Sequence, residues 1–93
     1  MQVDLKPTIY KNLTSSLSAV KNGPGRLKGF YVNSTSSGTI KIYDSLTQAN
    51  TVMNNTITPA IGWHTIGGPG GTAFLTGLSV TIGGTLDITL YYE

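Results

Sequence analysis

The residues of this chain that could do chemistry are few and lie far apart in the sequence. His64 is the only histidine, and there is no cysteine. A catalytic triad needs a histidine with an acid and a nucleophile placed around it, and a transition-metal site needs a cluster of ligands. Asp44 and Asp87 have no spacing that would favour their use as a glycosidase dyad. We therefore expect no catalytic residue, no metal site, no cofactor and no enzyme activity.

One segment is rich in glycine but does not match a phosphate-binding loop. Residues 67–71 read Gly-Gly-Pro-Gly-Gly. Phosphate loops carry glycine at fixed offsets, open a helix and usually end in Lys-Ser/Thr. Here a strand is expected next, so the segment is interpreted as a loop tip that can touch a partner.

Aromatic and basic residues alternate near the middle of the chain, as they do in some sheets that bind single-stranded nucleic acid. Lys28, Phe30, Tyr31 and Lys41 form this pattern. Phe30 and Tyr31 point to opposite faces of a strand, so at least one belongs to the core. With a net charge of only +2, we expect no direct binding of nucleic acid.

The basic residues are concentrated in the first part of the chain. All six precede residue 42, and they are Lys6, Lys11, Lys21, Arg26, Lys28 and Lys41. Such asymmetry can steer docking onto an acidic partner surface, although a solvated loop face would give the same pattern. Lys6, Lys11, Lys21 and Arg26 are the candidate interface residues from this region.

The C-terminal segment has the clearest alternation. Residues 78–82 and 85–92 alternate apolar with polar side chains on either side of Gly83-Gly84, which predicts a hairpin with a two-residue turn. Tyr91 and Tyr92 follow each other on this strand, so one ring faces the core and the other is exposed. An exposed tyrosine suits a subunit interface, and both are candidate interface residues. Packing against a neighbouring strand of the same chain is the alternative.

The rest of the chain contains short strand patterns separated by turn residues. Strands are expected over 26–32, 39–44, 51–58, 62–66 and 72–75, and a hairpin loop is expected over 33–38. Residues 12–21 fit a short helix or an irregular strand. The chain is expected to be a single domain over 1–93, with 1–25 as an irregular N-terminal arm. About six to eight short strands predict an all-β antiparallel sandwich of jelly-roll type.

The apolar positions of these strands define the expected core. It consists of Leu27 or Phe30, with Val32, Ile40, Ile42, Trp63, Phe74, Leu78, Val80, Ile82, Leu86, Ile88 and Leu90. A chain of 93 residues buries a modest fraction of its surface, and without cysteines it has no disulfides. Oligomerisation is then a common way to bury more area. Only 11% of the residues are charged, below the usual quarter or so, which fits faces that meet other protein.

The chain has no apolar segment of the length that spans a membrane, and its first residues lack the apolar core of a secretory signal. We therefore expect synthesis in the cytoplasm and no membrane association.

Three stretches together carry a family resemblance. They are LKGFYVNSTSSGTIKIYD at 27–44, NTITPAIGW at 55–63 and GLSVTIGGTLDIT at 77–89. Their order resembles that of small virion structural proteins of tailed bacteriophages, many of which are head decoration (cement) proteins. The resemblance covers about residues 26–92, and residues 1–25 lie outside it. No site residue is transferred, because the family has no chemical motif.

The resemblance implies a β-sandwich that sits on the capsid surface of a virion, binds the major capsid protein and stabilises the head. It also implies an oligomer, with a trimer favoured. The alternative function is a host-recognition or carbohydrate-binding module of a fibre or tail, with Trp63 and the segments 33–38 and 67–71 as a shallow binding surface. An exposed Trp63 would favour this alternative, and a buried one would make Trp63 part of the core.

Overall fold

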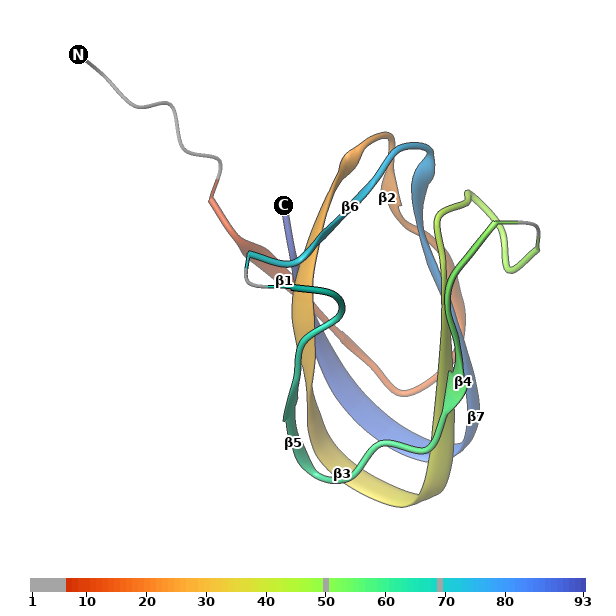
Figure 1. Cartoon of the computed structure of the whole chain (residues 1–93). Helices are drawn as coiled ribbons and strands as arrows, with labels where there is room; N and C mark the ends of the chain where they lie inside the picture. The colour runs from red at the N-terminus through yellow and green to blue at the C-terminus, as the bar shows by residue number, and fades with distance from the viewer. Residues whose placement is uncertain (1–6, 50, 69) are drawn as a thin grey trace.

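A computed structural model describes residues 7–49, 51–68 and 70–93, and within these ranges all regular structure is β-strand. Figure 1 shows the chain. The strands are β1 (Ile9–Leu13), β2 (Leu17–Asn22), β3 (Gly25–Tyr43), β4 (Val52–Ile57), β5 (Gly62–His64), β6 (Thr72–Phe74) and β7 (Gly77–Tyr92). The expected all-β antiparallel class is therefore confirmed, and so are the strands over 52–57, 62–64 and 72–74.

Two long strands form the centre of the sheet. β3 and β7 pair antiparallel along almost their whole length, from Leu27 opposite Tyr92 to Tyr43 opposite Ser79. Apolar residues alternate with polar ones over 30–32 and 40–42 of β3 and over 78–82 and 86–92 of β7, so one face of each half of the ribbon is apolar, as a half-buried sheet requires. The remaining strands add to the two sides of the ribbon, β1 and β2 to β7, and β4, β5 and β6 to β3.

The ribbon is folded over near its middle, and this bend corrects two predictions. Gly83-Gly84 is not a hairpin turn and 33–38 is not a loop, because both segments are strand and pair with each other. Ser36 and Ser37 both face Thr85, which is the two-against-one pairing of a β-bulge. Gly84 has a φ of 66°, a value that glycine adopts without steric cost. The bulge and the glycine let the strands turn sharply without leaving the ladder.

The bend produces two layers that face each other (Figure 1). The first layer contains β1, the second half of β7, the first half of β3, and β5 with β6; the second contains β2, the first half of β7, the second half of β3, and β4. The chain is therefore a small antiparallel β-sandwich, as its sequence predicts.

Residues 9–22 are not an irregular arm or a helix. β1 pairs with the second half of β7, and β2 pairs with its first half. The pairing of β2 shifts register between Leu17 and Lys21, and Ala19 within this stretch has a φ of 49°. The strand pattern is hard to recognise because the sequence 14–18 is rich in hydroxyl residues. The hydroxyls of Ser16 and Ser18 form hydrogen bonds that are not part of the backbone strand ladder.

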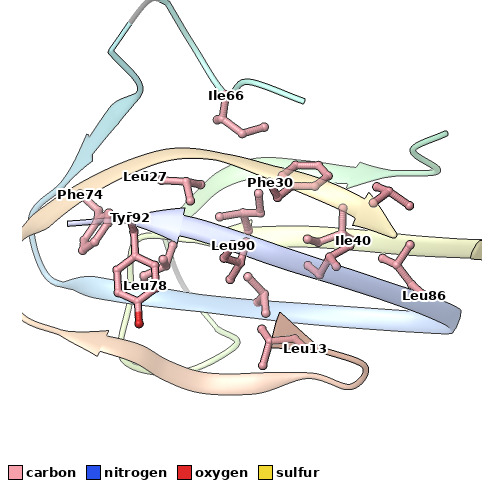
Figure 2. Close-up of a cluster of buried hydrophobic side chains, with 14 residues drawn as sticks. Leu13, Leu27, Phe30, Ile40, Ile66, Phe74, Leu78, Leu86, Leu90 and Tyr92 are labelled. Carbon is pink, nitrogen blue, oxygen red and sulfur yellow. The ribbon is translucent and has the colours of Figure 1, made fainter. Parts of the chain in front are cut away.

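The core lies between the two layers (Figure 2). Its buried members are Leu13, Leu27, Phe30, Val32, Ile40, Ile42, Ile66, Phe74, Leu78, Val80, Leu86, Ile88, Leu90 and Tyr92. Both Leu27 and Phe30 are buried, whereas only one of the two was expected in the core. Ile82 is only partly buried, beside the bend. Trp63 is the wrong prediction: it lies on the outer side of β5 and is 48% exposed.

Asp44 fastens the end of β3 to the connection between β6 and β7. Its carboxylate accepts hydrogen bonds from the backbone N–H groups of Leu75, Thr76 and Gly77, with the shortest at 2.8 Å from Thr76. Burial alone would raise the pKa of this carboxyl, but the three backbone donors outweigh it and lower the pKa below its usual value. Asp44 is thus a structural residue that closes the open end of the second layer.

Candidate functional site

Four aromatic side chains share the outer face of the first layer. They are Tyr10 of β1, Tyr91 of β7, Tyr31 of β3 and Trp63 of β5, which we call the aromatic strip. In the strand ladder Tyr10 lies opposite Tyr91, and Tyr31 lies opposite Trp63. Each of the four alternates with a residue that points the other way, such as Phe30 beside Tyr31 or His64 beside Trp63. The same alternation that buries the core therefore places these rings on the outside.

The strip is continuous from β1 to β5 because the position between Tyr91 and Trp63 is a glycine. The ring centroids of Trp63 and Tyr91 are 5.5 Å apart, and those of Tyr10 and Tyr91 are 6.5 Å apart. Gly29 of β3 lies between Tyr91 and β5, and a Cβ atom there would fall 2.6 Å from Cζ2 of Trp63. The indole of Trp63 therefore lies over Gly29 and closes the gap to Tyr91.

Much of the strip is open to solvent. Tyr10 is 71% exposed, Trp63 48% and Tyr31 42%, whereas large aromatic residues usually bury most of their area. Four such rings on one flat sheet face exceed the scattered apolar residues that any surface carries.

A cluster of polar side chains adjoins the strip toward the bend, and we call Asn12, Asn33, Asp87 and Thr89 the polar cluster. The side-chain amide of Asn12 donates to Oδ1 of Asp87 at 2.7 Å and to the carbonyl of Ile88 at 2.8 Å. The Asn33 amide donates to the same Oδ1 and to Oγ1 of Thr89, each at 3.1 Å. Two amides thus hold the carboxylate from opposite sides, and its orientation is fixed by β1 and β3.

The arrangement can bind a ligand by stacking and by hydrogen bonding. Asp87, Thr89 and Tyr91 are successive outward-facing residues of β7, so the Cα atoms of neighbouring members lie about 6.8 Å apart. Both oxygens of a carboxylate accept hydrogen bonds, and among the described residues Oδ1 of Asp87 takes the bonds from both asparagines. No side chain or backbone group of the described residues donates a hydrogen bond to Oδ2, so this oxygen has acceptor capacity to spare.

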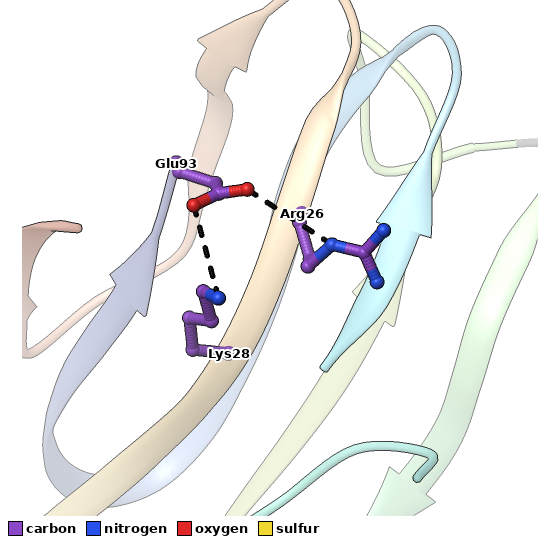
Figure 3. Close-up of polar contacts among 3 residues, drawn as sticks. All are labelled: Arg26, Lys28 and Glu93. Carbon is purple, nitrogen blue, oxygen red and sulfur yellow. Dashed lines mark ion pairs between the residues drawn. The ribbon is translucent and has the colours of Figure 1, made fainter. Parts of the chain in front are cut away.

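Two of the predicted basic interface residues, Lys21 and Arg26, lie at one end of the sandwich together with Lys28. Arg26 and Lys28 lie on the first half of β3, and Glu93 pairs with both, at 4.0 Å from Nε of Arg26 and 3.7 Å from Nζ of Lys28 (Figure 3). The ammonium of Lys21 lies beside Gly25, at the same end of the sandwich. We call Lys21, Arg26 and Lys28 the basic end.

The other predicted interface residues lie apart from the basic end or outside the described ranges. Lys11 is exposed on the edge strand β1. Lys6 lies outside the described residues. Tyr91 is on the outer face, as expected for one of the two terminal tyrosines. Tyr92 is 6% exposed and belongs to the core, where burial raises the pKa of its phenol. The ring of Tyr92 therefore packs inside the domain and not against a partner.

His64 has a structural environment. Its ring stacks on Phe30 with centroids 5.1 Å apart, and its Nε2 lies 2.8 Å from the carbonyl oxygen of Ala60. These contacts hold the connection from β4 to β5 against the core. In the described part of the chain, histidine and carboxylate side chains form no group of three that could hold a metal ion.

The aromatic strip could be predicted only in part from the sequence. Alternation alone separates Tyr31 from Phe30 and Trp63 from His64, but it does not say which member faces inward. Tyr10 lies in the stretch expected to be an irregular arm. That β1 and β5 lie on either side of the central ribbon, which brings the four rings together, depends on pairings between residues far apart in the chain.

Comparisons with known proteins identify no relative: no family model, no curated protein and no solved structure matches the chain. Among the described residues there is no helix long and apolar enough to cross a membrane.

Proposed function

We propose that this chain is a structural protein of a phage virion, most simply a decoration protein that binds the outside of a capsid. The β-sandwich supports this proposal, because a β-sandwich is what the motif resemblance over residues 26–92 implies. Sandwiches of the jelly-roll type serve widely in viral capsids and lectins, so the fold alone does not assign a function. The observation that carries the proposal is the placement of the three motif stretches: 27–44 and 77–89 pair with each other as the ribbon of β3 and β7, and 55–63 runs from β4 to β5, which both pair with β3.

The basic end is the surface we assign to the capsid. Lys21, Arg26 and Lys28 lie together where β2 meets β3, with Glu93 as their acidic neighbour. The three cations outnumber the one side-chain carboxylate of Glu93, and the positive charge that remains raises the rate at which an acidic surface is found and fixes orientation on it. Each copy would bridge neighbouring capsid subunits, and the summed contacts would oppose opening of the shell. We propose that the copies act as a homo-oligomer, with a trimer on threefold positions.

Binding to capsids tests the proposal. Heads of the phage that encodes this chain, assembled without it, are mixed with the purified protein and separated by sedimentation. We expect saturable binding that weakens as salt increases. The double variant Lys21→Glu/Arg26→Glu should lose binding, whereas Lys41→Glu, a matched charge reversal on the second layer, should retain it. Light scattering of the free protein tests the trimer. Failure of the wild-type protein to bind such heads would overturn the proposal.

A recognition module of a fibre or tail is the second candidate function. The exposure of Trp63 favours it, because a buried Trp63 would have been a core residue with no binding role. In this case the aromatic strip, and not the basic end, is the functional surface. The two candidates differ in which variants abolish function, so one set of proteins tests both.

A further inference from the structure

We propose that the aromatic strip and the polar cluster together form a binding site for a neutral glycan, taken as a chain of several sugar units. This inference rests on the second candidate function and specifies its site and its ligand. It does not depend on whether the domain is carried by a head or by a fibre.

The rings supply one half of such a site. Sugar rings have faces that carry C–H groups, and the negatively polarised face of an aromatic ring attracts them. Trp63 and Tyr31 are neighbours across β5 and β3, and Tyr91 with Tyr10 continues the strip across β7 and β1. Three strand steps separate β1 from β5, which gives the strip a length of about 14 Å. A surface of this length suits several linked sugars, not a single one.

The polar cluster supplies the other half. Sugar hydroxyls both donate and accept hydrogen bonds, so a site for them needs acceptors and donors that are already oriented. Asp87 is held through Oδ1 by the amides of Asn12 and Asn33, and its other oxygen, Oδ2, takes no hydrogen bond from the described residues and can accept one from a hydroxyl. A carboxylate whose position is fixed before binding loses little rotamer freedom on binding.

The charges of the site indicate the class of glycan. Asp87 is the charged residue of the polar cluster, and a negative site disfavours uronic or sialic acids by like-charge repulsion. Lys28, near the Tyr91 end of the strip, is already paired with Glu93 at 3.7 Å. The site therefore fits a neutral polysaccharide such as a glucan or galactan.

The exposure of its rings distinguishes this surface from a pocket for a small molecule. Small ligands are usually enclosed by concave sites, whereas here the rings stand on an open sheet face. An extended chain gains contacts from each unit along such a face and needs no enclosure. Moderate affinity per unit and a dependence on chain length are the expected signature.

The experiment measures binding of the full chain to neutral and acidic oligosaccharides. The neutral probes are maltoheptaose, cellohexaose and galactohexaose, and the acidic probe is oligogalacturonate of similar length. Emission of Trp63, the only tryptophan, reports contact with the strip, and calorimetry gives the affinities. We expect a neutral probe to bind with an affinity that rises with chain length, and the acidic probe to bind at least about tenfold more weakly.

Variants locate the site. Trp63→Ala and Asp87→Asn should each weaken binding about tenfold or more, while Leu75→Ala, a similar exposed position away from the strip, should leave it unchanged. Circular dichroism and urea unfolding check that each variant is folded. Equal binding by Trp63→Ala and wild type, stronger binding of the acidic probe, or no binding of any probe would each overturn the inference.

The same variants separate this inference from the capsid proposal. If Trp63→Ala loses capsid binding and no glycan binds, the strip is a protein-docking face and the glycan inference is wrong, although the virion role stands. If glycan binding depends on Trp63 while capsid binding depends on Lys21 and Arg26, both stand. If glycan binds and heads do not, the glycan inference stands and the decoration proposal is wrong.

Discussion

Replacing Asp44 with asparagine should destabilise the domain at neutral pH. The carboxylate accepts from three successive backbone N–H groups, at 2.9 Å from Leu75, 2.8 Å from Thr76 and 3.4 Å from Gly77. An asparagine with its oxygen in the place of Oδ1 still accepts from the three donors but without the negative charge, and its NH₂ group, in the place of Oδ2, is turned toward the N–H of Leu75. Hydrogen bonds to a charged acceptor are worth about 1.5–3 kcal/mol each, and Asp44 is only partly buried, so solvent screening reduces this. We expect the free energy of unfolding to fall by about 1–2 kcal/mol.

The pH dependence makes this prediction specific. The pKa of Asp44 is lower in the folded protein than its ordinary value of 3.8. The unfolded chain therefore binds the proton more readily, and the stabilisation is fully present above pH 4–5 and lost as pH falls through the folded pKa. Below that pH the protonated carboxyl resembles the asparagine amide. The difference between wild type and Asp44→Asn should thus shrink as the solution is acidified.

Urea unfolding of both proteins, followed by Trp63 fluorescence at pH 7 and at about pH 2.5, gives the two differences. Asp87→Asn is the control, because it makes the same change in net charge at a surface site where two side-chain amides, and no backbone N–H group, donate to the carboxylate. The reasoning fails if Asp44→Asn is as stable as wild type at pH 7. It also fails if a deficit at pH 7 persists unchanged at low pH, since the lost stability would then not depend on the charge.

Three further predictions follow from the core and the aromatic strip. Phe30→Ala should cost about 3–5 kcal/mol in urea unfolding, because it empties a fully buried position and removes the stacking partner of His64; a loss under 1 kcal/mol would contradict the described core. Trp63, at 48% exposure, should emit at a long wavelength and be quenched readily by acrylamide, and emission typical of a buried indole would be the contrary result. Tyr92 has a pKa above 10.0 through burial, so stability should be lost as pH rises past 10. Tyr92→Phe should lose less, and an equal loss in wild type and variant would refute this.

The strand positions could be read from the sequence because alternation is a local signal. Phe30, Val32, Ile40 and Ile42 recur at every second residue within their two runs, and each run needs only its own neighbours to identify its buried face. The same holds for the run from Leu86 to Tyr92, which is why Tyr91 and Tyr92 were separated correctly into an outer and an inner position. Positions whose burial follows from local alternation were therefore predicted well.

The bend could not be read in the same way. Gly83-Gly84 between two alternating segments is the signature of a tight hairpin, yet here each segment pairs with β3 and not with the other. The choice between a turn and a bend depends on a partner strand that lies 36 residues earlier in the chain at the pair of Tyr43 and Ser79 and 65 residues earlier at the pair of Leu27 and Tyr92. The Ser/Thr-rich stretch 33–38 was misread for the same reason, since it becomes strand only because 83–87 lies alongside it.

The exposure of Trp63 shows how the fold decides a question that composition leaves open. Either Trp63 or His64 must face inward from β5, and tryptophan is the more apolar of the two. The register of β5 on β3 pairs His64 with Phe30 and Trp63 with Tyr31. Nε2 of His64 donates a hydrogen bond to the carbonyl oxygen of Ala60, so the imidazole has a polar partner on the inner side. Once that register is fixed, Trp63 has to stand on the outer face.

The folded ribbon also explains why the two outer faces differ in chemistry. Each of the long strands β3 and β7 contributes one half to each layer, so the outward residues of a single strand are divided between the faces. β3 gives Tyr31 to the first and Lys41 to the second, and β7 gives Tyr91 to the first and Thr81 to the second. Tyr43, in the second layer, has a buried ring, and its hydroxyl accepts a hydrogen bond from the hydroxyl of Thr81 at 3.2 Å. Aromatic area is thereby concentrated on one side of the sandwich, and a ligand that stacks on rings has only that face to bind.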